Sequence, residues 1–167
     1  MVSVKIDKVT VNIGVGESGE PLEKAEKLLL KLTGQKPVRT RSKKRIPTWG
    51  IRRKQQIGVK VTLRGKKATD FLKMALEAKE NKLNPGNFDD NGNFAFGVSE
   101  YIDLPGIKYD PDIGIFGFDV CVTLIKDGYR VKRRKRAKAK IPARHKLSKE
   151  EAIEWVKSNL GVKVEAD

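Results

Sequence analysis

Residues 57–64 read Ile-Gly-Val-Lys-Val-Thr-Leu-Arg, and this stretch decides the fold class that the sequence predicts. Its apolar residues alternate strictly with glycine or polar residues, which is the period-two pattern of a half-buried strand. One face of this strand is therefore apolar, and the other carries Lys60, Thr62 and Arg64. Such a strand predicts a sheet that buries one side and leaves a cationic, hydrogen-bonding side open.

Similar patterns extend from this stretch in both directions. They predict strands at 9–13, 57–64, 94–98, 116–124 and 129–131, and a further strand that begins at residue 38. They also predict helices at 21–32 and 67–82, and a last helix that begins at the capping box of Ser148 and Glu151 and ends at Gly161. The order β-α-β-β-α-β-β-β-α predicts an α+β fold, with helices packed on one face of a mostly antiparallel sheet. A basic C-terminal arm and a terminal helix complete it.

The length of 167 residues fits one compact domain, or one domain with an appendage. We expect an α+β domain at 1–127, with the arm and C-terminal helix, 128–167, packed on it or appended to it. No run of eighteen apolar residues occurs, and Met1 leads directly into a strand pattern, so we expect a cytoplasmic protein without a membrane segment or signal peptide. Cys121 lies in an alternating apolar run and is interpreted as a small buried hydrophobic residue.

The charge of +15 is distributed very unevenly. Residues 27–69 contain 15 basic side chains and no carboxylate, and residues 128–149 contain 11 more, again without an acid. The rest of the chain is acidic. Segregation of this kind produces a directed positive field and predicts a polyanionic partner, which we take to be nucleic acid.

The two basic windows differ in what accompanies their cations. Residues 27–69 mix arginine and lysine with tryptophan, glutamine and threonine, which supply the phosphate, stacking and base-edge contacts of RNA recognition. Residues 130–140 are nearly pure lysine, arginine and alanine. We interpret them as an arm that neutralises an RNA backbone without sequence preference, a type of segment that often becomes ordered only on binding.

Gly14 to Gly19 form a literal G-x-G-x-x-G between a strand and a helix, the context of a dinucleotide-binding turn. This motif supports one alternative function, an NADP-dependent oxidoreductase. Glu17 and Glu20 count against it because they place carboxylates where a pyrophosphate would bind. We interpret the motif as a tight strand-to-helix turn.

No catalytic or metal-binding constellation is present in the sequence. His145 is the only histidine, and it has neither cysteine partners for zinc nor a placed base for a nucleophilic triad. We therefore expect no enzyme activity, no cofactor, no metal and no small-molecule substrate. An RNA chaperone remains a second alternative function.

Five segments of the chain resemble the signature segments of the universal large-subunit ribosomal protein five family, in order and over nearly the whole length. They are Val9 to Glu17, Thr33 to Pro37, Thr40 to Lys44, Ile57 to Arg64 and Ile107 to Pro111. The resemblance implies an α+β ribosomal protein that binds 5S rRNA and helps form the central protuberance. It also implies contacts with large-subunit rRNA, with P-site tRNA, and with neighbouring ribosomal proteins of the central protuberance and the small-subunit head.

The resemblance also assigns residues to these contacts. The 5S rRNA contacts would fall on Asn12, Gln35, Trp49, Thr62 and Arg64, with phosphate contacts from Lys36, Arg39, Arg41, Lys43 and Lys44. The loop that reaches toward P-site tRNA would carry Arg45, Thr48, Trp49, Arg52, Arg53 and Lys54, so Trp49 is assigned to both surfaces. The arm is assigned to the rRNA backbone from its composition and not from the resemblance, because its role does not transfer from bacterial members. Its cations are Arg130, Lys132, Arg133, Arg134, Lys135, Arg136, Lys138 and Lys140.

Both ends of the chain depart from the bacterial pattern of this family. The chain begins almost directly at its first strand, and it ends in the basic arm and a capped helix. These ends are typical of archaeal or eukaryotic members, and their compactness predicts an archaeal-type member.

Overall fold

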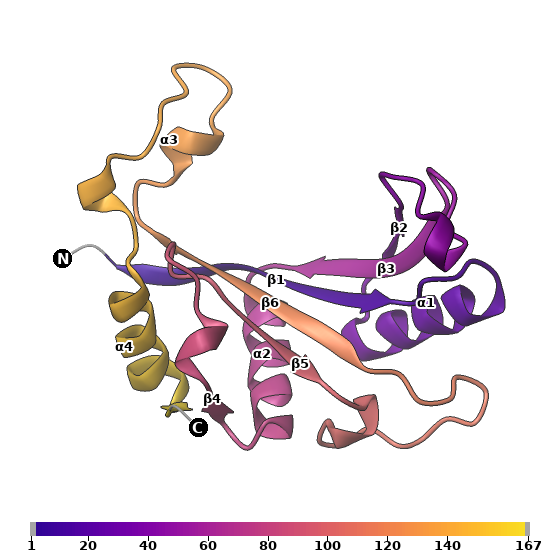
Figure 1. Cartoon of the computed structure of the whole chain (residues 1–167). Coiled ribbons are helices and arrows are strands. Elements are labelled where there is room, and N and C mark those ends of the chain that lie inside the picture. The colour runs from indigo at the N-terminus through magenta and orange to yellow at the C-terminus, as the bar shows by residue number, and fades with distance from the viewer. Residues whose placement is uncertain (1–2, 166–167) are drawn as a thin grey trace.

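A five-stranded antiparallel sheet in the order β2-β3-β1-β6-β5 organises the molecule (Figure 1). The computed structural model describes residues 3–165. The sheet strands are β1 (Val4–Gly14), β2 (Val38–Arg41), β3 (Gln56–Leu63), β5 (Phe94–Val98) and β6 (Phe118–Lys126). A second, parallel pair joins β4 (Lys82–Leu83) to β7 (Lys163–Val164).

The strand register sorts side chains onto two faces. Val11 lies between Val61 and Val120, and all three point into the core. Thr10, one residue earlier, lies between Thr62 and Cys121 on the other face. The alternation of 57–64 therefore translates directly into one buried and one open side of the sheet.

Three helices cover the buried side, α1 (Glu20–Thr33), α2 (Lys66–Ala78) and α4 (Lys149–Leu160), as Figure 1 shows. The apolar stripe of α1 is buried through Leu22, Ala25, Leu28 and Leu29, and α2 has an equivalent stripe. The predicted α+β fold with helices on one face is confirmed. Among the described residues, no helix has the length and hydropathy needed to cross a membrane.

The C-terminal helix begins and ends as the sequence predicted. The Ser148 hydroxyl accepts a hydrogen bond from the Glu151 backbone N–H, and the Glu151 carboxylate accepts one from the Ser148 N–H. Gly161 closes the helix in the left-handed region. Leu147, just before the helix, and Val156 within it are fully buried in the core shared with the sheet.

The predicted strand at 129–131 is wrong. Residues Arg130–Arg133 instead form the short helix α3. The backbone turns helically after Lys126 instead of extending, because the N–H groups of Tyr129, Val131 and Lys132 each donate to the carbonyl three residues earlier. The second predicted helix also ends early, at Ala78, because Glu80 and Asn81 adopt positive φ.

The interpretation of Cys121 as buried is also wrong. Val120 and Val122 point into the core, so Cys121 between them must point to the open side of the sheet, where it is exposed. Partial desolvation, followed by the nearby Asp119 carboxylate, raises the pKa of the thiol. The residue therefore belongs to the surface that the helices leave uncovered.

Candidate nucleic-acid interface

The open side of the sheet carries a band of small polar side chains, which we call the open face. Asn12 lies between Lys60 and Asp119, and the neighbouring row contains Thr10, Thr62 and Cys121. Three predicted 5S rRNA contacts share this face, Asn12, Thr62 and Arg64. Gln35 is brought beside them because its amide donates a hydrogen bond of 3.1 Å to the Thr62 carbonyl.

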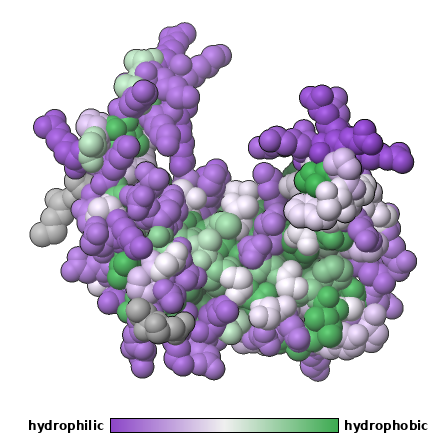
Figure 2. Space-filling view, viewed as in Figure 1, coloured by the Kyte–Doolittle hydropathy of each residue, from purple (hydrophilic) through white to green (hydrophobic). Residues whose placement is uncertain are grey.

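Two basic projections rise on the same side of the sheet (Figure 1). One is the β2–β3 loop, residues 42–55, and the other is the arm, residues 128–147. They stand at opposite ends of the sheet, away from the helices, and hydrophilic side chains cover both of them (Figure 2). An extended polyanion lying across the open face would meet both projections.

The β2–β3 loop has an ordered tip. Ile46 and Ile51 exchange backbone hydrogen bonds of 2.9 and 3.1 Å, and a short 3₁₀ helix, Pro47–Trp49, lies between them. Gly50 reverses the chain at a φ of 67°, a conformation that glycine adopts without strain. Trp49 is consequently presented at the tip with 73% of its surface exposed, at the end of β3 far from Arg64.

The base of this loop is tied to the glycine-rich turn. The Gln55 amide donates to the Ser18 hydroxyl at 3.1 Å. The N–H groups of Val15 and Gly16 both donate to the Ile57 carbonyl, at 3.0 and 2.8 Å. These donors are therefore not directed at a ligand, and the wholly antiparallel five-stranded sheet is not the parallel sheet of a dinucleotide-binding fold. The geometry supports the interpretation as a turn.

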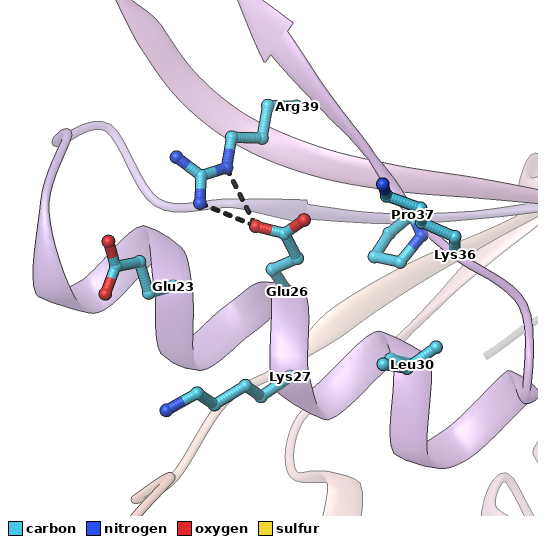
Figure 3. A pocket seen from close by; sticks show the side chains of 7 residues that line it. All are labelled: Glu23, Glu26, Lys27, Leu30, Lys36, Pro37 and Arg39. Atoms are coloured by element: carbon cyan, nitrogen blue, oxygen red, sulfur yellow. Dashed lines mark hydrogen bonds and ion pairs between the residues drawn. The ribbon is translucent and has the colours of Figure 1, made fainter.

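The predicted phosphate contacts differ in how they are paired. Arg39 is already ion-paired: its guanidinium binds the Glu26 carboxylate of α1 at 2.7 and 2.8 Å, beside a groove between α1 and β2 (Figure 3). Within residues 3–165, the remaining cations assigned to phosphate or tRNA form no ion pair. These are Lys36, Arg41, Lys43, Lys44, Arg45, Arg52, Arg53 and Lys54.

The arm is folded back on itself. The Arg134 side chain donates to the Ala137 carbonyl at 2.7 Å, and Ala137 adopts a positive φ of 49°. The Ala139 N–H donates to the Val131 carbonyl at 3.3 Å, which closes the arm as a loop. Arg133 is the only one of the eight predicted arm cations that forms an ion pair in the described part of the chain.

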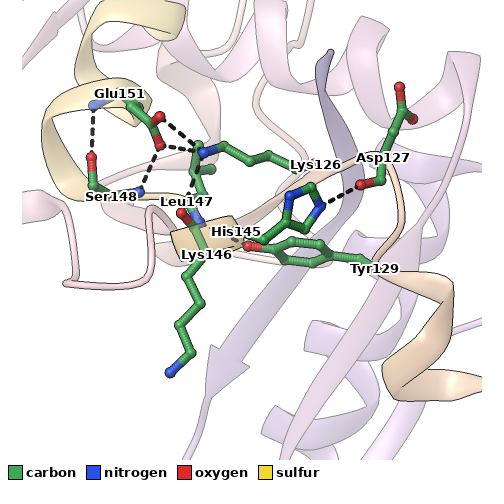
Figure 4. Close-up of polar contacts among 8 residues, drawn as sticks. All are labelled: Lys126, Asp127, Tyr129, His145, Lys146, Leu147, Ser148 and Glu151. Carbon is green, nitrogen blue, oxygen red and sulfur yellow. Dashed lines mark hydrogen bonds and ion pairs between the residues drawn. The ribbon is translucent and has the colours of Figure 1, made fainter. Parts of the chain in front are cut away.

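Both ends of the arm are joined at its base (Figure 4). The Leu147 N–H donates to the Tyr129 hydroxyl at 2.8 Å, and the His145 ring lies 2.7 Å from the Asp127 carbonyl oxygen. Lys126 of β6 pairs with Glu151 at 2.6 Å. Tyr129 and His145 therefore hold the arm closed, and the hydroxyl of Tyr129 is already engaged.

Family comparisons agree with this arrangement. The model described as ribosomal protein L5 matches residues 1–52, and the model for the C-terminus of the same ribosomal family matches residues 56–155. The chain belongs to the ribosomal protein L5 family. The resemblance noted in the sequence is thereby confirmed, as is the prediction of a structural ribosomal protein rather than an enzyme.

Relatives in the ribosomal protein L5 family cover nearly the whole chain. Each of three bears the name large ribosomal subunit protein uL5, and all three are archaeal, in agreement with the predicted type. The one from Archaeoglobus fulgidus is 56% identical over 165 residues, which is 99% of this chain and 92% of its own. Those from Methanococcus aeolicus and Sulfurisphaera tokodaii are 54% and 53% identical, over 98% of this chain and 92% and 93% of theirs.

Sequence reasoning missed one residue in the interface of this L5-family protein. Asp7 lies in β1, outside both acid-free windows, and its side chain is only 7% exposed. Arg133 of the arm and Arg64 at the end of β3 both bind its carboxylate. The hydrogen bonds from Arg133, which outweigh partial burial, hold the pKa of Asp7 below its ordinary value. Only a three-dimensional register could have revealed this residue.

The lowered pKa of Asp7 predicts an acid-dependent contribution to stability. Because the folded pKa lies below the unfolded one, the ion pair stabilises the fold above the ordinary carboxyl pKa of about 3.9 and loses its effect as the pH falls through the lower folded value. We expect Asp7→Asn to lower the unfolding free energy by about 1 to 2 kcal/mol near neutral pH. This value already allows for solvent screening of the two half-exposed arginines.

Urea unfolding of the two proteins between pH 7 and pH 2 measures this effect. The difference between wild type and Asp7→Asn should shrink below about pH 4. Asp119→Asn is the matched control, because Asp119 is exposed and forms no ion pair in the described residues. A difference that stays constant down to pH 2 would contradict the prediction.

Proposed function

We propose that this protein is a structural component of the large ribosomal subunit that binds 5S rRNA through its open face and helps form the central protuberance. The observation that carries the proposal is the placement of the two basic projections on either end of the open face, on the side of the sheet that no helix covers. The names of its archaeal relatives support the subunit assignment.

The chemistry of this surface fits docking on a folded RNA. Unpaired lysines and arginines neutralise phosphates and release counterions, which supplies most of the affinity. Asn12, Gln35 and Thr62 offer amide and hydroxyl groups that can hydrogen-bond to bases or riboses. The open face is therefore suited to recognising one RNA surface, and the arm and the base of the β2–β3 loop to holding it.

The β2–β3 loop is proposed to contact P-site tRNA and to lie near the small-subunit head. Its tip presents Trp49, Arg52 and Arg53, and it extends from the end of the sheet farthest from the arm. An exposed indole stacks on an unpaired base or a base edge, while nearby guanidinium groups hold the adjacent phosphates. This combination is appropriate for contact with a second RNA.

Titration of the purified protein with 5S rRNA, at several salt concentrations, tests the main proposal. We expect saturable binding that weakens by about three to five powers of ten between 50 and 200 mM salt if six to ten phosphates are contacted. A structured RNA of equal length serves as competitor and should displace 5S rRNA poorly. Equal affinity for both RNAs would refute specific recognition.

Two further assays on the purified protein distinguish the proposed function from the alternatives. Strand annealing without a preferred RNA would indicate an RNA chaperone. A titration with NADP should be flat, because the N–H groups of Val15 and Gly16 are bonded to Ile57 and the first turn of α1 carries Glu20 and Glu23. A saturable NADP signal would contradict the interpretation of residues 14–19 as a turn.

A further inference from the structure

We propose that Asp7 positions the arm against the sheet, so that the arm and the open face bind 5S rRNA as one surface. This inference rests on the proposed function, since it assigns a role within the same RNA interface. Asp7 is one of the few carboxylates on the basic side of the molecule, and it lies where the two acid-free windows meet.

A β-bulge places Asp7 outside the regular ladder of the sheet. Ile6 pairs with Leu124 and Lys8 with Thr123, so β1 advances by two residues where β6 advances by one. Asp7 is the extra residue. Bulges of this kind redirect a side chain, and here the bulge lets a carboxylate from a central strand reach the arm.

The contact with Arg133 fixes orientation as well as distance. The two terminal nitrogens of Arg133 donate to the two different oxygens of Asp7, one of them at 2.7 Å. Two parallel hydrogen bonds between a planar guanidinium and a carboxylate hold both groups in one relative orientation. Because Arg133 belongs to α3, this pair sets the direction in which the arm leaves the sheet.

Arg64 ties the open face to the same carboxylate. Its guanidinium donates to an Asp7 carboxylate oxygen at 3.2 Å and to the Asp7 carbonyl oxygen at 3.4 Å. The carboxylate is nearly buried, whereas the side chains of Arg64 and Arg133 are 58% and 49% exposed. A guanidinium has five N–H donors, so each arginine keeps donors for a phosphate while it remains bound to Asp7.

The other contacts at the base of the arm do not fix its direction. Tyr129 with Leu147 joins the two ends of the arm to each other, and Ala139 with Val131 closes the arm on itself. Lys126 holds the end of the arm to β6 through the Lys146 carbonyl. Among the described residues, the pair of Asp7 and Arg133 is the side-chain hydrogen-bonded ion pair that joins α3 to the sheet.

Simple electrostatics and positioning predict opposite results when the Asp7 charge is removed. A carboxylate beside an RNA surface repels phosphates, so its loss should raise RNA affinity if Asp7 has no other role. If Asp7 positions the arm, loss of the Asp7 charge frees the arm. RNA binding must then also order the arm, which costs free energy. Ordering even one or two long side chains and a loop weakens association, by about tenfold for each 1.4 kcal/mol.

The experiment compares Asp7→Asn, Arg133→Gln and the double variant with wild type. Amide hydrogen exchange of residues 130–139 in the free protein reports the order of the arm, and titration with 5S rRNA at fixed salt reports affinity. Asp119→Asn is the control for removing a negative charge from the open face. Lys132→Gln is the control for removing a cation from α3, because Lys132 forms no ion pair in the described residues.

We expect Asp7→Asn to accelerate exchange in the arm and to weaken 5S rRNA binding by about tenfold. Arg133→Gln should accelerate exchange equally, and the double variant should be no worse than Arg133→Gln alone, because both changes break one contact. Lys132→Gln should leave exchange unchanged, and Asp119→Asn should leave affinity equal or higher.

Unchanged exchange of the arm in Asp7→Asn would overturn the proposal, and so would RNA affinity equal to or above that of wild type. Exchange is measured without RNA, so failure of wild type to prefer 5S rRNA would refute the proposed function separately. Exchange of the core strands shows whether Asp7→Asn is folded. Arg133→Gln alters a half-exposed side chain and provides the same test from the other side of the contact.

Discussion

Replacement of Lys135, Arg136, Lys138 and Lys140 by glutamine is expected to lower the affinity for 5S rRNA by roughly two powers of ten near physiological salt. All four side chains are exposed, and none forms an ion pair in residues 3–165. Removal of each cation that binds a phosphate should reduce the slope of log affinity against log salt by about 0.7 to 0.9. The slope should therefore fall by about three.

Four lysines on the helical side provide the control for this arm variant. Replacement of Lys66, Lys67, Lys73 and Lys79 by glutamine removes the same charge from exposed positions on or next to α2, which covers the opposite face of the sheet. This control should reduce both affinity and slope far less than the arm variant. Equal losses in the two variants would mean that overall charge, and not the arm, determines binding.

Local patterns in the sequence predicted most of the architecture. The alternation in 57–64 predicts both faces of β3, and helix signals such as the capping box at Ser148 and the glycine at 161 mark boundaries that the structure confirms. These signals succeed because they depend on residues within a few positions of each other. The prediction for Cys121 was wrong because an apolar residue in an alternating run is buried only on one parity, and Val120 and Val122 already occupy the buried one.

Pairings between distant segments could not be predicted in this way. The pairing of β6 with β1 on one side and β5 on the other joins segments that are far apart in sequence. The bulge at Asp7 likewise depends on how β1 aligns with β6. Composition predicted the basic surface correctly in outline, but it could not reveal that Arg39 and Arg64 already bind carboxylates.

Not all of the cations in the two basic windows are available to bind RNA. Arg39 lies opposite the buried Val59 and binds α1 on the helix-covered side of the sheet, and Arg64 binds β1, so both cations contribute to the fold. The unpaired cations are concentrated at the β2–β3 loop and the arm, at the two ends of the sheet. The small polar residues between them carry little charge, which is the arrangement expected when projections hold an RNA and the face between them reads it.

Trp49→Ala is expected to remove the contact of the β2–β3 loop with tRNA while leaving 5S rRNA binding intact. The indole is 73% exposed, and the backbone pairing of Ile46 with Ile51 does not involve it, so the loop should keep its shape. Loss of one stacked base lowers affinity by about 1 to 3 kcal/mol, or roughly five- to 150-fold. Trp49→Phe retains an aromatic face and should retain most of the binding.

Binding of tRNA to the preformed complex of protein and 5S rRNA measures this effect, together with a nuclease footprint on 5S rRNA. The footprint should be the same for wild type and Trp49→Ala, because Trp49 lies at the end of β3 opposite Arg64, beyond the open face. Loss of protection at a 5S rRNA nucleotide would place the indole on 5S rRNA instead. In that case the surface that binds 5S rRNA would include the loop tip, because Trp49 and the polar side chains of the open face would contact the same RNA.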